Sequence, residues 1–349
     1  MTILVTGGAG FIGSNFVLDW LARCDEPVVN LDRLVYPTWR ASLAALAGDA
    51  RHLLVEGDIG DARLVADLLE RHRPRAVVHL AAESHVDYSI AAPERFLEAN
   101  VTGTFTLLQA VRAWLDRQDQ TDAATRAAFR FLHVSTDEVY GSLVPGVASF
   151  TEAHPYLPNN PYAASKAAGD HLARAWHHTF GVPVIISHCS NNYGRHQMPE
   201  KLIPRLIARA LAGQALPLYG DGLHVRDWLH VADHCAALRL LLERAAAGSV
   251  WNVGGGNERS NRAVAEAVCA ALDGLRPRAD GRSYREQIAL VADRAGHDRR
   301  YAIDARKLTT ELGWRPGHAF EQGLHETVRW YVEHPDWLRM ADAGRSSAG

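Results

Sequence analysis

The chain has 349 residues, of which 47% are hydrophobic and 22% charged, and its formal net charge is -3. This is the composition of a globular protein with a large buried core, and the length suggests about two domains or one large α/β unit with an appended lobe. The nearly neutral charge excludes a strong electrostatic attraction to nucleic acid or to an anionic membrane, so a phosphate-bearing ligand would need local positive groups.

The cysteines and the start of the chain indicate a cytoplasmic protein. Four cysteines lie far apart and form no C-x-x-C pair: Cys24, Cys189, Cys235 and Cys269. We therefore expect reduced thiols, with neither a zinc ribbon nor a redox dithiol. The first residues lead directly into an apolar segment, without the basic region and cleavage site of a secretory signal. No apolar run reaches the length of about 18 residues that a membrane helix needs.

In the first half of the chain, short β-branched segments alternate with longer amphipathic ones. The expected strands are residues 3–6, 28–32, 53–56, 76–80 and 131–135, and the expected helices are residues 11–23, 43–47, 61–72 and 93–115. The polar residues 116–128 are expected at the surface. Nearly continuous apolar strands suit a parallel sheet that is covered on both faces. The alternation therefore predicts an α/β fold with a doubly wound parallel (Rossmann) sheet.

The second half is less regular. Residues 161–180 are expected to form a helix and residues 184–187 a strand. Beyond them we expect a loop at 191–200, a strand at 250–253, an irregular polar segment at 277–300, and helices at 201–211, 231–245, 263–272, 305–312 and 320–334. This loss of alternation predicts a smaller mixed α/β lobe at the C-terminal end.

A glycine-rich turn follows the first expected strand and reads Thr6-Gly7-Gly8-Ala9-Gly10-Phe11-Ile12-Gly13. Such a turn lets a pyrophosphate approach backbone N–H groups at a helix N-terminus. Asp32 ends the next strand, nineteen residues after Gly13, where a carboxylate would bind a ribose 2′-hydroxyl. Asp32 would repel a 2′-phosphate and Arg33 could attract one, so the pair favours NAD over NADP without deciding between them. Asp58 and Ile59, after the third strand, could frame the adenine.

Tyr162 and Lys166 lie four residues apart at the start of a predicted helix, so they share one face about 6 Å apart along the axis. A nearby ammonium group favours the phenolate form of a tyrosine. Tyr162 could therefore take a proton from an alcohol near neutral pH, which is the step that precedes hydride transfer to a nicotinamide.

Asp137 and Glu138 follow the strand before that helix, in the segment Ser135-Thr-Asp-Glu-Val-Tyr-Gly141. Ligands bind at this edge of a doubly wound sheet. Neighbouring residues of a strand point in opposite directions, but a turning backbone could aim both carboxylates at one substrate. If their environments separate their pKa values, one can act as an acid and the other as a base.

Taken together, nine segments resemble the dTDP-glucose 4,6-dehydratase family, nucleotide-sugar enzymes of the extended short-chain dehydrogenase type. The segments are TGGAGFIGSNF (6–16), LAAESHVD (80–87), STDEVYG (135–141), YAASK (162–166), CSNNYG (189–194), PEKLIP (199–204), LYGDG (218–222), VRDWLHVADH (225–234) and GHDRRYAID (296–304). Sugar 4-epimerases usually carry small residues where Asp137 and Glu138 stand. GDP-mannose dehydratases and UDP-glucuronate decarboxylases carry serine in place of the aspartate.

The resemblance implies a reaction and a role for each catalytic residue. Tyr162, assisted by Lys166, removes the proton of the C4 hydroxyl while the C4 hydride goes to NAD. Glu138 then removes the C5 proton, Asp137 protonates the departing C6 hydroxyl, and the hydride returns to C6. Thr136 would hydrogen-bond the C4 oxygen. The product would be dTDP-4-keto-6-deoxy-glucose.

The resemblance also implies the binding residues and the domains. The NAD-binding residues would be Gly7, Gly10, Phe11, Ile12, Gly13, Asp32, Arg33, Asp58, Ile59, Leu80, Ala81, Ala82, Ser84, Ala99, Tyr162, Lys166 and Asn192. The nucleotide-sugar-binding residues would be Ser84, Thr136, Asn191, Lys201, Leu202, Pro217, Tyr219, Arg226, Asn261, Arg294 and His297. Residues 1–190 would form the NAD-binding domain that carries the catalytic residues. Residues 191–340 would mainly bind the nucleotide sugar, with one or more segments returning to the first domain, and residues 341–349 would be a flexible tail.

Some positions depart from the family pattern. Residues 32–39, after the second strand, read D-R-L-V-Y-P-T-W, whereas the family usually shows a T-Y-A-G-N stretch there. Pro37 and Trp39 are therefore expected to change the backbone beside the adenosine half of NAD. His230 replaces a common tyrosine and Ala295 a proline. A paralogue with a shifted sugar preference therefore remains open.

Several other expectations accompany this interpretation. His230 and His234 lie four apart on an expected helix, but no third ligand accompanies them, so no metal is expected. A homodimer through the helices at 93–115 and 161–180 follows from the resemblance.

The alternatives to the dehydratase function are a related enzyme, such as a UDP-hexose 4,6-dehydratase or a 4-epimerase, and a non-catalytic dinucleotide-sensing protein.

Overall fold

The computed structural model describes residues 1–119, 123–144 and 146–343. In this part of the chain a seven-stranded parallel sheet has the order β10-β6-β5-β4-β1-β2-β3. Its strands are β1 (Ile3–Thr6), β2 (Val28–Asp32), β3 (His52–Glu56), β4 (Ala76–His79), β5 (Arg130–Thr136), β6 (Val184–Cys189) and β10 (Val250–Val253). The strand order reverses between β1 and β4, which is the point where doubly wound sheets bind ligands. The predicted Rossmann fold is confirmed.

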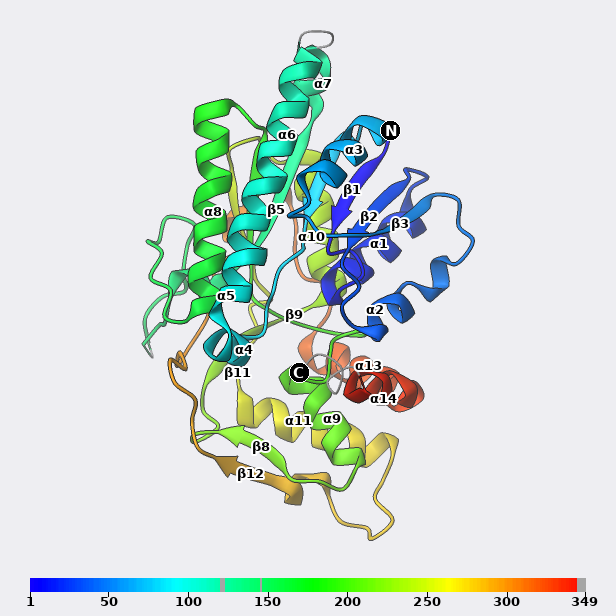
Figure 1. Cartoon of the computed structure of the whole chain (residues 1–349). Coiled ribbons are helices and arrows are strands. Elements are labelled where there is room, and N and C mark those ends of the chain that lie inside the picture. The colour runs from blue at the N-terminus through cyan, green and yellow to red at the C-terminus, as the bar shows by residue number, and fades with distance from the viewer. Residues whose placement is uncertain (120–122, 145, 344–349) are drawn as a thin grey trace.

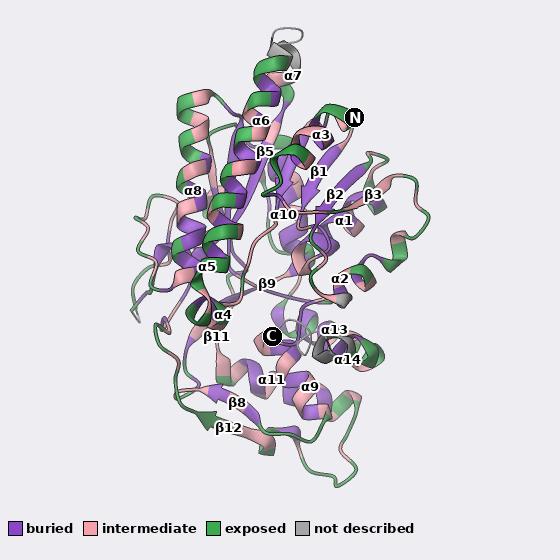
Figure 2. Ribbon diagram, in the orientation of Figure 1, coloured by how far each residue is buried: buried purple, intermediate pink, exposed green. Residues whose placement is uncertain are grey.

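Helices cover both faces of this sheet (Figure 1). On one face lie α1 (Phe11–Arg23), α10 (Val231–Arg244) and α12 (Arg306–Leu312), which share one apolar core with the strands. On the other lie α3 (Ala62–His72), α6 (Thr104–Asp119) and α8 (Pro161–Phe180), with a second core. The strands between the layers are almost wholly buried (Figure 2), except the edge strand β3, and this burial explains their nearly continuous apolar sequences.

Local capping signals set the ends of α3 and α8. The Asp61 side chain accepts from the N–H groups of Arg63 and Leu64 at the start of α3. The Asn160 side chain accepts from the Ala163 N–H at 2.8 Å, and α8 ends before Gly181, which has a φ of 67°. As a result α8 spans the predicted residues 161–180.

The predicted helix at 93–115 is instead a series of shorter elements: α5 (Pro93–Phe96), a π-helical turn η2 (Leu97–Gly103) and α6, with α4 (Val86–Ala91) before them. The wider turn places Asn100 between two other segments. Its side chain accepts from the Glu83 N–H at 2.9 Å and donates to the Glu83 carbonyl at 3.0 Å and to Ser165 Oγ on α8 at 2.8 Å. The turn therefore ties the loop after β4 to helix α8, and π-turns of this kind often occur at functional sites.

A smaller lobe follows the main sheet along the chain (Figure 1). It contains a sheet of β7 (Asn191–Tyr193), β9 (Val225–His230) and β11 (Glu258–Ser260), and a pair of β8 (Leu216–Tyr219) and β12 (Ile288–Val291). Helices α9 (Leu202–Leu211), α11 (Asn261–Leu275), α13 (Phe320–Glu333) and α14 (Pro335–Ala343) complete it, and most of its elements share one apolar core.

Several predicted elements were wrong. The structure has α2 (Pro37–Ser42) and a 3₁₀ turn η1 (Ala44–Leu46) where one helix at 43–47 was predicted. Strands β8, β9 and β11 were not predicted, β7 lies within the predicted loop 191–200, and a 3₁₀ turn η4 (Tyr284–Gln287) and β12 lie within the irregular segment 277–300. The surface position predicted for residues 116–128 agrees with the exposure of 116, 117, 127 and 128; the segment is helical to Asp119 and again in α7 (Ala123–Ala128), while 120–122 lie outside the described residues. Helix α14 runs to Ala343, into the expected tail, and residues 344–349 are not described.

These errors share a physical cause. Strands of three or four residues leave little periodic pattern, and packing against the rest of the lobe decides their conformation. None of the helices in the described residues has the length and apolar character needed to cross a membrane.

Candidate active site

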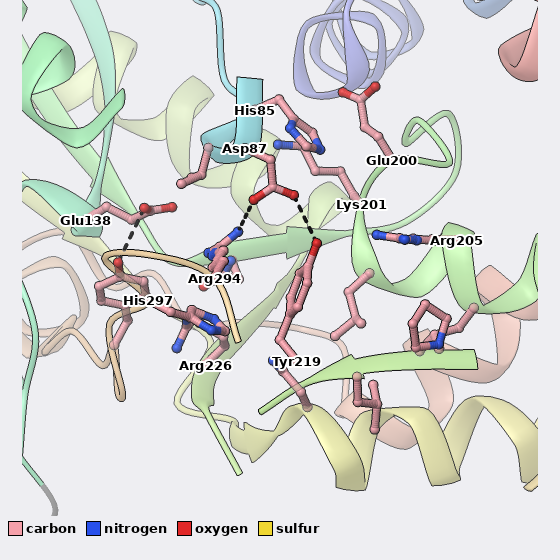
Figure 3. Close-up of a pocket in the computed structure, with 18 of the residues that line it drawn as sticks. His85, Asp87, Glu138, Glu200, Lys201, Arg205, Tyr219, Arg226, Arg294 and His297 are labelled. Atoms are coloured by element: carbon pink, nitrogen blue, oxygen red, sulfur yellow. Dashed lines mark hydrogen bonds and ion pairs between the residues drawn. The ribbon is translucent and has the colours of Figure 1, made fainter. Parts of the chain in front are cut away.

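Three adjoining cavities form one groove along the C-terminal ends of the central strands. The β2 cavity is lined by Gly7, Leu31, Asp32, Arg33, Val35, Trp39, Gly57, Asp58, Ile59, Leu80, Ala81, Ala82, Glu83 and Ala99. The central cavity shares Gly7, Leu80 and Ala82 with it. The lobe cavity, between the main sheet and the smaller lobe (Figure 3), shares Ser84, Glu138, Asn191, Glu200 and Lys201 with the central one. A long two-part ligand could therefore lie in the first two cavities and meet a second ligand at Glu138.

The structure brings nearly all the predicted site residues to this groove. The central cavity contains Phe11, Ile12, Gly13, Ser84, Thr136, Asp137, Glu138, Tyr162, Lys166, Asn191 and Asn192. The lobe cavity contains Lys201, Leu202, Pro217, Tyr219, Arg226, Asn261, Arg294 and His297. Gly10 lines none of the three cavities; it is the N-cap of α1, and its N–H donates to the Gly7 carbonyl at 3.2 Å. Gly10 thus shapes the turn from outside the cavity walls.

The glycine turn has no room for side chains at two positions. Gly7 has a φ of 71°, and a Cβ there would lie 2.5 Å from the Ala81 nitrogen. A Cβ on Gly13 would lie 2.1 Å from the Gly7 carbonyl oxygen. The turn therefore packs closely on the loop after β4 and leaves the N-terminus of α1 facing the central cavity, as a diphosphate site requires.

Asp32 and its neighbours make the β2 cavity more suitable for a ribose with free hydroxyl groups than for one with a 2′-phosphate. The Asp32 carboxylate is buried and accepts from the Ala9 and Leu34 N–H groups, each at 2.9 Å. It still has lone pairs for ribose hydroxyls and would repel a 2′-phosphate. Arg33 lies 3.3 Å from Asp58. Since Asp58 compensates part of its positive charge, Arg33 is a weaker attraction for a 2′-phosphate than the sequence alone suggested. Val35 and Trp39 also line this cavity, so part of the unusual segment 34–39 faces the ligand.

Tyr162 and Lys166 project from α8 into the central cavity. Tyr162 is nearly buried and packs edge to face against Phe96, with 6.3 Å between the ring centroids. The Lys166 ammonium group donates to the Val134 carbonyl at 2.8 Å rather than to the phenol. Burial and then the Glu138 carboxylate raise the pKa of Tyr162 well above its usual value, and burial lowers that of Lys166. The phenol is therefore protonated in this arrangement, and further positive charge in the cavity is needed to make it a base.

A buried polar cluster supports this helix from behind. Asp170, one turn after Lys166, lies 3.1 Å from His133 Nε2 and 3.0 Å from His188 Nε2, and accepts from Ser135 Oγ at 2.9 Å. Despite its burial, the contacts with His133 and His188 depress the pKa of Asp170. The cluster connects α8 to β5 and β6, and no local pattern in the sequence indicates it.

Asp137 and Glu138 lie in a 3₁₀ turn, η3 (Asp137–Tyr140), that directly follows β5. Thr136 Oγ1 accepts from the Glu138 N–H at 3.3 Å and caps this turn. Asp137 is 1% exposed, and its Oδ2 has no hydrogen-bond partner among the described residues. Burial and then the Glu138 charge raise the pKa of Asp137 well above its usual value. Asp137 is therefore suited to donate a proton, while Glu138 lines both the central and the lobe cavity.

The lobe cavity gathers the cations that an anionic ligand needs. Lys201 donates to the Ser84 carbonyl at 2.7 Å. Arg294 and Tyr219 both bond to Asp87, at 3.1 and 3.3 Å (Figure 3). Arg205 and Arg226 line the same cavity, which therefore offers four positive side chains for a diphosphate. Asp87 was not predicted, although it ends the segment LAAESHVD, because its role as a bridge depends on residues distant in the sequence.

The histidines of the second half do not change the expectation that no metal is bound, which stays a prediction. His230 ends β9 and stacks on His318, whereas His234 lies within α10 and bonds to Asn192 at 3.0 Å. The expectation that they share a helix was wrong.

Elsewhere in the described residues, Asp293 lies 3.3 Å from His224 and 2.7 Å from His297. These two rings are stacked, and the charges of Arg226, Arg294 and Arg299 act on them, so the trio is a poor cation site.

Comparisons with known proteins agree with this geometry. Residues 4–327 match the family model described as GDP-mannose 4,6 dehydratase. A dTDP-glucose 4,6-dehydratase of Xanthomonas campestris pv. campestris (strain B100) is 57% identical over 97% of this chain and 95% of its own length. One from Escherichia coli (strain K12) is 47% identical over 99% and 96%. The crystal structure of DesIV, a dTDP-glucose 4,6-dehydratase of Streptomyces venezuelae with NAD and TYD bound, is similar with a TM-score of 0.88, at 46% identity over 98% of this chain and 100% of that one.

Proposed function

This chain belongs to the dTDP-glucose 4,6-dehydratases, NAD-dependent hydro-lyases, and we propose that its groove divides their reaction among the residues described above. NAD fits the first two cavities because a glycine turn stands beside a helix N-terminus and Asp32 stands at the end of β2. When bound, NAD supplies a reversible hydride acceptor. The DesIV structure, with NAD and TYD bound, supports the same cofactor and a nucleotide in the lobe cavity here.

We propose for the catalytic residues the roles that the family resemblance implies, and the positions of the side chains in the groove support these roles. Tyr162 takes the proton of the C4 hydroxyl, with Lys166 supplying positive charge from the same cavity. Thr136 holds the C4 oxygen. Glu138 removes the C5 proton, which the 4-ketone makes acidic. Asp137, whose raised pKa keeps it protonated, donates to the departing C6 hydroxyl.

The observation that carries this proposal is the adjacent pair Asp137–Glu138 at the junction of the central and lobe cavities. A 4-epimerase needs no acid and base for the loss of water. Only a dehydratase gains from one buried, protonated carboxyl group and one carboxylate at the same hexose. The lobe cavity supplies Lys201, Arg226 and Arg294 for the diphosphate and Asn261 for further polar contacts of the nucleotide.

One assay of the purified protein tests the function. With dTDP-glucose we expect a 4-keto-6-deoxy sugar, seen as absorbance that develops in alkali, and no net formation of NADH, because the hydride returns to the sugar. UDP-glucose should react much more slowly. A C4 epimer as the product, or faster turnover of UDP-glucose, would favour one of the related enzymes. Binding of NAD without any product would favour the dinucleotide-sensing alternative.

We also propose a homodimer through η2, α6 and α8. Leu97 and Phe105 are 56% and 43% exposed on this face, and Phe105 packs edge to face against Trp176 of α8. Large apolar side chains that are exposed on the surface are typical of a protein interface. Light scattering should give a mass of about two chains in solution; a monomer at micromolar concentration would contradict the proposal.

The division into domains and the location are proposals as well. Residues 1–190 contribute six strands of the main sheet and the catalytic residues, residues 191–340 supply most of the lobe cavity, and β10 returns to the main sheet. The four cysteines are free thiols, which suits the reducing cytoplasm. Cell fractionation would test that location.

A further inference from the structure

Helix α2 contacts the loop at residues 194–198 beside the groove in which we place NAD. The Thr38 hydroxyl of α2 donates to the Met198 sulfur at 3.1 Å, and both side chains are buried. Met198 lines the central cavity, whereas Val35 and Trp39, which precede and follow Thr38 in the chain, line the β2 cavity. The contact therefore joins a wall of one cavity to a wall of the other.

The C-terminal helices bind the same loop from the side of the smaller lobe. The Gln197 carbonyl accepts from the Tyr331 hydroxyl of α13 at 2.6 Å and from the Trp337 indole N–H of α14 at 3.3 Å. A carbonyl oxygen has two lone pairs, so these two donors satisfy it. Tyr331 and Trp337 are 0% and 5% exposed, so both bonds are shielded from water.

The Trp337 ring also supports an unfavourable backbone conformation in the loop. His196 has a φ of 68°, in the left-handed region that residues other than glycine seldom adopt. Its imidazole stacks on the Trp337 ring, with 5.1 Å between the centroids, and packs edge to face against Trp330. Such conformations persist only where the surroundings fix them. The loop conformation that places Met198 in the central cavity therefore depends on α13 and α14.

Helix α14 also packs against α2 (Figure 1), so it contacts both the helix and the loop that the Thr38–Met198 bond joins. Ala41 of α2 packs against the lobe core that includes Trp337. At the other end of α2, the Ser42 hydroxyl lies 2.9 Å from the carbonyl of Ala9 in the glycine turn. The contacts of α14 are therefore continuous, through α2, with the turn proposed to bind the diphosphate.

We propose that Thr38, Met198, Tyr331 and Trp337 form a clasp that retains the cofactor in the groove, an inference that rests on the position of NAD in the proposed function. Their contacts must break before α2 and the loop can separate. Retention serves this reaction because the hydride taken from C4 has to return to C6 of the same sugar. Cofactor that left between these steps would strand the oxidised sugar in the site.

The experiment measures how fast bound cofactor leaves the protein when no sugar is present. The protein is incubated with excess NADH to replace bound NAD, freed of unbound NADH, and mixed with a large excess of NAD. The change in NADH fluorescence then gives the rate constant of release. In Tyr331→Phe and Thr38→Val, which nearly keep the side-chain shapes, we expect release to be about threefold to tenfold faster, because each removes one hydrogen bond of the clasp.

Trp337→Ala should have a larger effect. It removes the indole N–H and the stacking on His196 together, so we expect release to be faster by about thirtyfold or more. With saturating NAD, kcat should stay within about threefold in all three variants, because a change in cofactor release leaves the bound complex intact. After free NAD is removed, however, their activity should decline with time and should recover when NAD is added.

Thr327→Val is the matched control for the loss of a buried hydroxyl. Thr327 is 3% exposed on α13, and its hydroxyl donates to the Gly323 carbonyl of the same helix at 2.7 Å. This variant removes no contact between the loop, α2 and α14. Its rate of release should therefore equal that of the unaltered protein.

Three results would overturn the clasp. The first is release from Tyr331→Phe and Thr38→Val at the rate of the unaltered protein; these two variants decide the matter if Trp337→Ala does not fold. The second is equal acceleration in Thr327→Val, and the third is release from the unaltered protein faster than its own turnover. Slow release without any 4-keto-6-deoxy sugar from dTDP-glucose would instead reject the proposed function, while the release rates of the variants would still decide on the clasp.

Discussion

Replacement of Tyr162 by phenylalanine is expected to lower kcat by about 10²–10⁴-fold, the usual contribution of a positioned acid–base group. In the proposed mechanism the Tyr162 phenol, which lines the central cavity, takes the proton of the C4 hydroxyl, and its packing against Phe96 holds the ring in place. Without it the C4 proton has no acceptor, so the first step should become rate-limiting. Formation of enzyme-bound NADH in a single turnover would then be slow and would not be followed by an accumulating intermediate.

The same variant should bind substrate and cofactor almost normally, because only a hydroxyl is lost. Tyr156→Phe, which removes a hydroxyl outside the groove, provides a control for the general effects of the substitution. A Tyr162→Phe protein with nearly full activity would mean that another group takes the C4 proton. In the unaltered protein the raised pKa of Tyr162 should make C4 oxidation faster as the pH rises.

Asp137→Asn should slow the loss of water by about 10²-fold or more and affect C4 oxidation much less. The amide keeps the size of the side chain but cannot protonate the departing C6 hydroxyl. The oxidised sugar should therefore wait in the site, and bound NADH should accumulate in a single turnover. Equal slowing of both steps would contradict the role assigned to Asp137.

The pH dependence provides a second measurement for the same residue. Because burial and the Glu138 charge raise the pKa of Asp137, its carboxyl group stays protonated to higher pH than an ordinary aspartic acid. Loss of water should therefore slow as the pH rises through this raised pKa, and that limb of the pH profile should be missing in Asp137→Asn. A limb that persists in the variant would have to belong to another group.

Local sequence signals explain why much of the first half could be predicted. Strands 3–6 and 28–32 and helices 11–23 and 161–180 have the predicted bounds. Asn160 before Pro161 and Gly181 at the other end mark α8 without any help from distant residues. The glycine turn, Asp32 and the Tyr162–Lys166 pair carry their chemistry at fixed spacing, so they could be placed at one site from the sequence alone.

The smaller lobe was harder to predict because its strands depend on distant partners. Strand β9 carries the buried charges Arg226 and Asp227, which hide its pattern. Asp227 is stabilised by the N–H groups of Gly255 and Asn257, and Arg226 lies against Tyr301. Asp87 was missed for the same reason: it is a common residue type whose importance follows only from what the fold places beside it.

In the π-helical turn at residues 97–103, the orientation of Asn100 depends on the number of residues in the segment. An α-helix completes a turn in fewer residues, so loss of one residue there would let the helix wind regularly and would rotate Asn100 by about 100° about the axis. The loop that carries Leu80–Ser84 would then be uncoupled from the helix that carries Tyr162, although no residue of either would have changed. We therefore expect insertions and deletions to be far less tolerated in this segment than substitutions on its exposed face.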